Sequence, residues 1–115
     1  MTLDPECIFC KIIEGQIPAE IIYRNDNVLA FNDLNPQAPT HILIIPTLHA
    51  ENAAAVAAIS PTIIAAMHRA ADEIAAEIGL TGYRTVFNTG ADAGQSVFHA
   101  HLHLLGGRGL AWPPG

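Results

Sequence analysis

The chain has 115 residues, of which 50% are hydrophobic and 14% charged, and its net charge is -6 at pH 7. This length suits one domain, and this composition excludes a disordered chain. The 5 basic residues stand singly in the sequence, so the chain lacks the basic stripe that a nucleic-acid binder uses to displace counterions.

The first half of the chain predicts one short helix followed by strands. The helix is expected over residues 8–14 and ends near Gly15. A turn at residues 25–27 and a proline-containing loop at residues 35–39 separate the apolar segments. These apolar runs predict three strands, over residues 21–24, 28–31 and 41–45.

The longest predicted helix covers residues 61–78, within an alanine-rich stretch from 53 to 76 that favours helix throughout. Ser60 is expected to cap this helix, Pro61 suits its first position, and Gly79 ends it. Two further strands are predicted downstream, over residues 83–88 and 100–105. Helices and strands are thus mixed without regular βαβ alternation, which predicts an α+β domain built on an antiparallel sheet.

Nothing in the sequence predicts a membrane or secreted protein. No apolar run approaches the ~20 residues of a membrane-spanning helix, and residues 1–6 are acidic and polar rather than signal-like. Cys7 and Cys10 stand too close together for a useful structural disulfide. We therefore expect a cytoplasmic protein with no membrane or nucleic-acid partner, and the low charge favours an oligomer.

His99, His101 and His103 alternate with apolar residues in the last predicted strand. Alternate residues of a strand share a face, so the imidazoles project from one side of the sheet. A buried strand with incidental histidines is a poor explanation, because buried imidazoles need partners. Imidazole is largely neutral near pH 7, so the pattern indicates either metal ligation or direct attack of a ring nitrogen on phosphorus.

The loop at residues 89–96 directly precedes these histidines and contains Gly90 and Gly94. Glycines permit positive φ and close approach of a ligand, and successive backbone N–H groups cradle anions. Such a loop is usually only a turn, but its place before a histidine-rich strand favours a phosphate site.

Cys7 and Cys10 form a Cys-x-x-Cys pair, and His49 and His99 are candidate further metal ligands. Two cysteines and two histidines suit tetrahedral zinc. Two packed thiols or a redox pair are the alternatives, although a redox pair expects a βαβ context that the sequence lacks.

Other side chains are candidates for nucleotide binding on weaker grounds. Asp33 follows a strand and could accept both hydroxyls of a ribose, or could simply cap a turn. His68 lies on the long predicted helix and is interpreted as solvated or partly packed, not as a ligand. Apolar residues that could line a base pocket, or simply belong to the core, are Phe9, Ile12, Ile17, Phe31 and Leu34.

The segment His-Ala-His-Leu-His-Leu-Leu at residues 99–105 matches the His-φ-His-φ-His-φ-φ signature of the histidine triad (HIT) superfamily. Further segments resemble its HINT branch, the histidine triad nucleotide-binding proteins, which are purine nucleoside phosphoramidases. These segments are residues 7–13, 17–19, 30–33, 36–41, 94–99 and 112–115. The resemblance covers residues 7–115 in one collinear pass.

The resemblance implies a single HIT domain over residues 1–115, with an N-terminal extension at 1–6 and a C-terminal tail at 106–115. It implies a five-stranded antiparallel sheet with one long and one short helix. Two copies would join their sheets into a ten-stranded one, making a homodimer. The tail carrying Trp112 would lie near the partner subunit's active site and influence the choice of leaving group.

The resemblance also implies roles for individual side chains. His101 would be the nucleophile and form a nucleotidyl-histidine intermediate that water hydrolyses. His41 would orient it, and His103 and Ser96 would contact the phosphate or leaving group. The implied nucleotide-contacting residues are Ile8, Phe9, Ile12, Phe31, Asp33, Leu34, Asn88, Gly94, Gln95, Ser96, Val97, His101 and His103.

Many animal HINT proteins lack the Cys-x-x-Cys pair, whereas many bacterial relatives bind zinc through it and two histidines. By that resemblance Cys7, Cys10, His49 and His99 hold a structural Zn²⁺, because four protein ligands leave no open position for water. The metal would fix His99 and so the strand that presents His101. No organic cofactor is expected.

The leading functional hypothesis is a phosphoramidase that releases AMP or GMP from purine nucleoside phosphoramidates, including aminoacyl-adenylate-like substrates. No arginine is placed to stabilise a polyphosphate leaving group, which makes amines or monophosphates the expected leaving groups. The alternatives are a dinucleoside polyphosphate hydrolase from a neighbouring HIT branch, and a nucleotide-binding adaptor whose output is protein association.

Overall fold

The structure, a computed structural model, describes residues 3–115, so residues 1–2 of the predicted extension lie outside the described part. Its elements are α1 (Ile8–Ile13), β1 (Ile21–Arg24), β2 (Val28–Asn32), β3 (Thr40–Pro46), α2 (Ala53–Ile59), α3 (Pro61–Glu77), β4 (Tyr83–Phe87), the 3-10 turn η1 (Ala91–Ala93) and β5 (Leu102–Gly106). None of the helices within residues 3–115 has the length and apolar character needed to cross a membrane.

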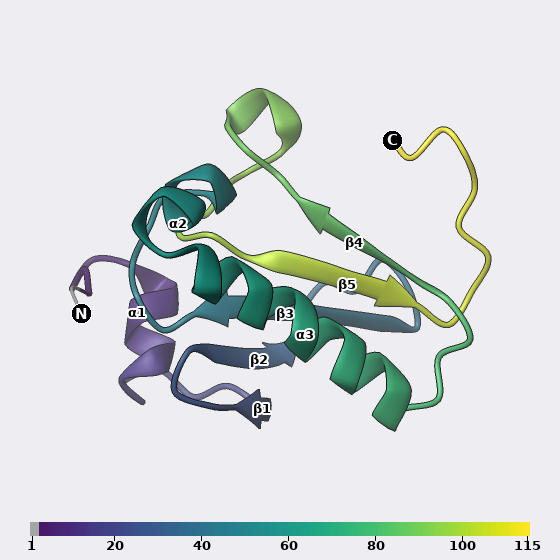
Figure 1. The fold of residues 1–115 in the computed structure, drawn as a ribbon, viewed down its shortest axis with the longest axis horizontal. Coiled ribbons are helices and arrows are strands. Elements are labelled where there is room, and N and C mark those ends of the chain that lie inside the picture. The colour runs from purple at the N-terminus through teal and green to yellow at the C-terminus, as the bar shows by residue number, and fades with distance from the viewer. Residues whose placement is uncertain (1–2) are drawn as a thin grey trace.

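The strands form one five-stranded antiparallel sheet in the order β1-β2-β3-β5-β4 (Figure 1). β5 is last in the sequence but lies between β3 and β4, which brings the two halves of the chain together. His41 of β3 is consequently opposite Leu105 of β5, and Leu43 is opposite His103. The predicted α+β architecture is confirmed, with β1 and β4 as the edges of the sheet.

The two faces of the sheet are covered differently. Helix α3 lies across one face (Figure 1), where it buries an apolar core made of Val28, Ala30, Ile42, Ile44, Met67, Ala70, Ala71, Ile74, Leu102 and Leu104. On the other face, α1 contributes Phe9 and Ile12 to a second core with Leu29, Phe31, Leu43 and Ile45. Each buried Val, Leu, Ile, Phe or Met side chain in these cores stabilises the fold by about 1.5–3 kcal/mol. The part of this second face beside β5 carries the histidines.

The alanine-rich stretch forms two helices rather than one. The side chain of Asn52 caps α2 by accepting the N–H of Ala55. Ser60 then adopts extended backbone, with φ of -155°, because a residue before proline avoids the helical region, and α3 begins at Pro61. The predicted Ser60 cap is wrong in one detail, since within the described chain its side chain makes no capping hydrogen bond. Gly79, with φ of 78°, ends α3 as expected.

Candidate functional site

His99, His101 and His103 lie on the α1 face of the sheet, as their alternation predicted. Strand β5 begins at Leu102, two residues later than expected, but the alternation continues back through residue 99. Leu102 pairs with Phe87 and packs under α3. The ring of Phe9 in α1 contacts the rings of His99 and His101 edge-on, with centroids 5.8 and 5.2 Å apart. Helix α1 therefore supports the histidines from one side.

His101 has one ring nitrogen held and the other available. Its Nδ1 lies 2.8 Å from the backbone carbonyl oxygen of His99. A carbonyl only accepts, so the neutral ring carries its proton on Nδ1 and a lone pair on Nε2. The side chain is 9% exposed, packed against Phe9 and the His103 ring, whose centroid is 5.0 Å away. This is the arrangement that an imidazole nucleophile requires.

His41 and His103 form a hydrogen-bonded pair beside this ring. His41 Nε2 lies 2.8 Å from His103 Nδ1 and 3.4 Å from Oδ2 of Asp33. Within residues 3–115, Nε2 of His103 is buried and has no hydrogen-bond partner. Buried polar groups are almost always paired, so this nitrogen indicates a place for a ligand.

Burial keeps both of these imidazoles neutral. It lowers the pKa of His103 to about 4, an effect that His101 and His41 strengthen and Asp33 opposes. Burial also lowers the pKa of His41, again opposed by Asp33. Near pH 7 the pair therefore offers hydrogen bonds rather than positive charge.

Gln95 holds the glycine-containing loop together. Its buried side chain accepts the N–H of Gly90 at 2.9 Å and donates to the carbonyls of Glu51 at 2.7 Å and Val97 at 3.1 Å. Its own N–H donates to the Gly90 carbonyl at 3.1 Å, and that of Gly94 to the Ala91 carbonyl at 2.9 Å. These two backbone donors are thus used within the loop.

The other candidate polar residues lie around this loop and the histidines. Ser96 is exposed and Asn88 is half-buried directly after β4. Asp33 accepts the N–H of Asn35 at 2.8 Å, so it caps a turn, the alternative that its position suggested, while its second oxygen faces His41.

The apolar candidates for a base pocket fall into two groups. Phe9, Ile12 and Phe31 are buried in the core under α1. Ile8 is 48% exposed, and Leu34 at 101% has no part in that core. A groove of about 530 Å³ is lined by Ile8, Ser96 and Val97 and continues to His49. Three of the predicted nucleotide contacts therefore share one concave surface.

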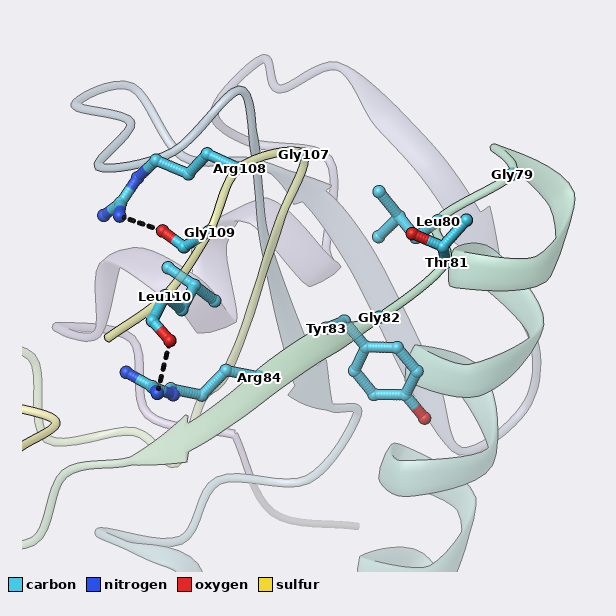
Figure 2. A pocket seen from close by; sticks show the side chains of 10 residues that line it. All are labelled: Gly79, Leu80, Thr81, Gly82, Tyr83, Arg84, Gly107, Arg108, Gly109 and Leu110. Carbon is cyan, nitrogen blue, oxygen red and sulfur yellow. Dashed lines mark hydrogen bonds between the residues drawn. The ribbon is translucent and has the colours of Figure 1, made fainter. Parts of the chain in front are cut away.

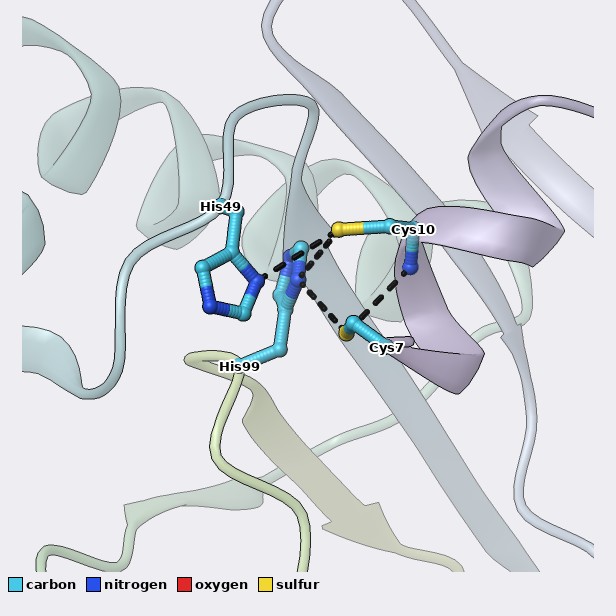
Figure 3. A group of neighbouring side chains, drawn as sticks. All are labelled: Cys7, Cys10, His49 and His99. Atoms are coloured by element: carbon cyan, nitrogen blue, oxygen red, sulfur yellow. Dashed lines mark hydrogen bonds between the residues drawn. The ribbon is translucent and has the colours of Figure 1, made fainter. Parts of the chain in front are cut away.

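Cys7, Cys10, His49 and His99 converge on one point (Figure 3). Nδ1 of His99 lies 3.4 Å from Cys7 Sγ and 3.5 Å from Cys10 Sγ, and Nδ1 of His49 lies 3.4 Å from Cys10 Sγ. Zinc–sulfur bonds of about 2.3 Å and zinc–nitrogen bonds of about 2.0 Å at a tetrahedral centre separate sulfur from nitrogen by about 3.5 Å. These three sulfur–nitrogen distances therefore match those of a tetrahedral zinc site.

Local hydrogen bonds orient the side chains of Cys7, Cys10 and His99 in this cluster. Cys7 is the N-cap of α1 and accepts the N–H of Cys10, which sets both sulfurs on the first turn. His99 Nε2 lies 3.1 Å from the Pro46 carbonyl oxygen, so its proton is there and Nδ1 faces the sulfurs. Burial raises the pKa of Cys10 to about 11 and lowers that of His99 to about 4. A cation is what would hold the thiolate in this position.

A separate cavity of about 640 Å³ lies where α3 leads into β4, lined by residues 79–84 and 107–110 (Figure 2). Its two arginines bond to chain carbonyls: Arg84 to Leu110 and Ala111, Arg108 to Gly109 and Gln37. The lining holds no histidine, cysteine or carboxylate. Its side-chain hydroxyls are those of Thr81 and Tyr83, and the Tyr83 hydroxyl donates to Asp72 at 2.8 Å.

Sequence reasoning missed one contact in the site. The backbone N–H of Gln37 donates to Nδ1 of His41 at 3.0 Å. A backbone group carries no side-chain signal, and the proline-containing loop at residues 35–39 indicated only a turn.

Comparisons of the sequence and the fold with known proteins identify the relatives of this chain. The HIT domain family matches residues 14–110. The chain is 47% identical to the purine nucleoside phosphoramidase of Escherichia coli, over 91% of this chain and 90% of that protein. It is 46% identical to a 14 kDa zinc-binding protein of Zea mays, over 97% and 90%. The crystal structure of a HIT family hydrolase from Legionella pneumophila superposes with a TM-score of 0.91 at 47% identity, covering 96% of this chain and 100% of that one.

Proposed function

Because the chain belongs to the HIT domain family, we propose that it hydrolyses the phosphorus–nitrogen bond of purine nucleoside 5′-phosphoramidates, with His101 as nucleophile. The proposal rests on the properties of two ring nitrogens in adjacent side chains, Nε2 of His101 and Nε2 of His103. Nε2 of His101 has a lone pair because Nδ1 donates to a carbonyl, and the adjacent ring of His103 has a buried, unpartnered Nε2 within residues 3–115. A nucleophile and a neutral donor thus stand side by side.

The reaction follows in two displacements at phosphorus. Nε2 of His101 attacks, a bond from histidine to phosphorus forms, and the bond to the amine nitrogen breaks as that nitrogen takes up a proton. Water then attacks phosphorus, and the histidine–phosphorus bond breaks with its electron pair returning to Nε2. The proton that the water loses balances the one taken up by the amine, and the nucleoside monophosphate is released. Nε2 of His103 hydrogen-bonds the phosphate or leaving group, and Ser96 assists at the leaving group.

The nucleotide lies beside the loop and the catalytic histidines, with its base toward the end of the groove that Ile8 and Val97 line. Asp33 binds the ribose hydroxyls through the lone pairs that its turn contact leaves available. Asn88 and the loop from Gly94 to Val97 hold the phosphate. The Ser96 N–H is the donor of choice, since the N–H groups of Gly94 and Gln95 are bonded within the loop. The purine packs against apolar side chains: Ile8, Phe9, Ile12, Phe31, Leu34 and Val97.

Cys7, Cys10, His49 and His99 hold a structural zinc ion in this proposal. Their spacing fits tetrahedral zinc, and a relative from Zea mays is a zinc-binding protein. When bound, the ion supplies a crosslink between α1 and the segment before β5 rather than reactivity, because all four positions are taken by protein. Reduced thiols of this kind also support a cytoplasmic location.

Two copies associate as a homodimer through the β4 edge, which joins two five-stranded sheets into one of ten. An edge strand presents unpaired backbone groups that favour such pairing. Trp112, 82% exposed on the tail, then reaches the partner's site and affects leaving-group choice.

The deciding experiment is release of AMP from adenosine 5′-phosphoramidate by wild type and His101→Ala, with a diadenosine polyphosphate run alongside. Phosphoramidate cleavage that the substitution abolishes supports the proposal. Preferential cleavage of the polyphosphate instead reassigns the enzyme to the dinucleoside polyphosphate hydrolases. If neither is cleaved while AMP binds, a nucleotide-binding adaptor is the better assignment.

A further inference from the structure

We propose that the backbone N–H of Gln37, in a loop whose Gln37 carbonyl is bound by Arg108, fixes the tautomer of His41 and thereby makes Nε2 of His103 a hydrogen-bond donor toward the substrate. The identity of that substrate rests on the proposed function, whereas the proton positions do not. Gln37 and Arg108 are positioning residues in this proposal, because they act through His41 and touch no reacting atom.

The contact with Gln37 determines which ring nitrogen of His41 carries the proton. The Gln37 N–H lies 3.0 Å from Nδ1 of His41, and a backbone N–H only donates. Nδ1 must therefore accept, and a neutral imidazole has a single N–H group, which then sits on Nε2. The lowered pKa of His41 agrees with a ring that stays neutral.

The proton on Nε2 of His41 in turn fixes the tautomer of His103. Nε2 of His41 is 2.8 Å from Nδ1 of His103, so the His41 proton points at that nitrogen, which must accept. The proton of neutral His103 is then on Nε2. This is the buried atom that has no partner within residues 3–115, and a buried N–H without an acceptor is costly. An oxygen of a phosphate ester or phosphoramidate supplies the missing acceptor.

The two neighbouring rings thus present opposite polarity to the same ligand. His101 donates from Nδ1 to a backbone carbonyl and offers a lone pair, whereas His103 accepts at Nδ1 and offers a proton. Two backbone groups cause this difference. The His99 carbonyl fixes the tautomer of His101, and the Gln37 N–H, acting through His41, fixes the tautomer of His103. Without the Gln37 N–H, the contact that remains to oppose reversal of the His41–His103 pair is the longer one between Nε2 of His41 and Oδ2 of Asp33, at 3.4 Å.

Arg108 binds the carbonyl of Gln37, in the peptide group that follows the one carrying the Gln37 N–H. Its Nε and Nη2 donate to the Gln37 carbonyl at 3.3 and 3.0 Å. The neighbouring Gly107 has φ of 88°, and a Cβ there would lie 2.9 Å from Cβ of Pro39. The start of the C-terminal tail therefore packs tightly on the loop at residues 35–39 and holds that loop against His41.

The direct test replaces the Gln37 amide by an ester, through incorporation of the α-hydroxy analogue into the full-length zinc-loaded chain. The readout is ¹⁵N NMR of the histidine rings, which distinguishes the two tautomers without any substrate. In wild type we expect Nε2–H on His41 and on His103. The ester is expected to add an Nδ1–H population to both rings and to lower kcat about tenfold, the change that one lost hydrogen bond produces. Gln37→Ala is the matched control, because it keeps the N–H and removes only the side-chain bond to the Asn35 carbonyl at 3.0 Å; it is expected to keep the wild-type tautomers of His41 and His103.

Arg108 is tested by Arg108→Ala against Arg24→Ala, because Arg24 makes a comparable exposed bond to the Ile13 carbonyl at 2.9 Å. Arg108→Ala is expected to shift the His41 and His103 ring signals and to lower kcat about threefold. Arg108→Lys is expected to restore part of both effects, and Arg24→Ala to change neither. Wild-type spectra with Nδ1–H on His41 or His103, or ester spectra identical to wild type, would overturn the proposal that the Gln37 N–H fixes these tautomers. An unchanged Arg108→Ala spectrum would overturn the positioning role of Arg108. Failure of phosphoramidate turnover alone rejects the proposed function and leaves the NMR result to stand.

Discussion

His99 contacts the sulfurs of Cys7 and Cys10 through its ring and His101 through its backbone carbonyl. Its ring nitrogen Nδ1 faces the sulfurs of Cys7 and Cys10, while its backbone carbonyl oxygen lies 2.8 Å from Nδ1 of His101. Whatever holds the His99 ring also holds that carbonyl, and the carbonyl determines which nitrogen of His101 carries the lone pair. The chemistry and the stability of this site are therefore coupled.

His101→Ala is expected to lower phosphoramidate turnover by at least about a thousandfold, because no other group can form the intermediate. Binding of AMP, measured by calorimetry, should change by less than about threefold if the pocket is intact. Turnover within tenfold of wild type would show that the nucleophile is elsewhere.

Removal of zinc is expected to lower both the melting temperature and turnover. The metal ligands link α1 to the segment before β5, and His99 orients His101. Chelation should reduce Tm by at least about 5 °C, since each 1 kcal/mol shifts Tm by about that amount in a domain of this size. Metal analysis should find one zinc per chain.

Cys7→Ser and Cys10→Ser should reproduce the chelated state and make further chelator ineffective. Zinc affinity should rise with pH, because binding displaces the proton from Cys10, whose pKa is raised to about 11. A protein purified without zinc that has full activity and an unchanged melting temperature would contradict the metal assignment.

The parts of the fold that sequence predicts are those with strong local periodicity. The strands, the long helix and the shared face of the three histidines follow from alternation with period two or with helical spacing. The start of the long helix at Pro61 follows from the proline, whereas the separate helix α2 before it was indicated only as part of an alanine-rich stretch. Local patterns suffice where each residue's environment is set by its near neighbours.

Contacts between distant segments were not predictable in this way. The sequence places Gln95 in the predicted phosphate loop but does not indicate that its side-chain amide bonds the carbonyl of Glu51, 44 residues away. Arg108 and Gln37 are 71 residues apart, and the decisive groups there are a backbone carbonyl and N–H. Neither contact leaves a mark on the sequence, because any residue supplies a backbone group.

Stability is expected to fall as pH drops from about 7 toward 4, partly through His103. Its pKa is lowered to about 4 in the folded chain by burial, with help from His101 and His41 and opposition from Asp33, against about 6.5 when unfolded. Between these values the unfolded state binds more protons, so unfolding is favoured as pH falls; above about pH 7 the effect vanishes.

Urea unfolding at pH 7.5 and 5.5 measures this dependence. His103→Gln should lose less stability than wild type between the two values, because the buried imidazole is gone while the zinc ligands are unchanged in both proteins. Parallel losses in the two proteins would assign the pH dependence to other groups.

Gln95→Ala and Ser96→Ala are expected to separate loop stability from chemistry. The Gln95 side chain makes three hydrogen bonds in a buried position, and its loss should destabilise the fold by about 1–3 kcal/mol. Exposed Ser96 should change stability by less than about 0.5 kcal/mol. In turnover Ser96→Ala should lower kcat for amine leaving groups, whereas Gln95→Ala should chiefly raise KM, because the loosened loop no longer presents its remaining donors to the phosphate. Equal effects of the two substitutions on both unfolding and kcat would mean that the loop acts as one unit and that Ser96 has no separate role at the leaving group.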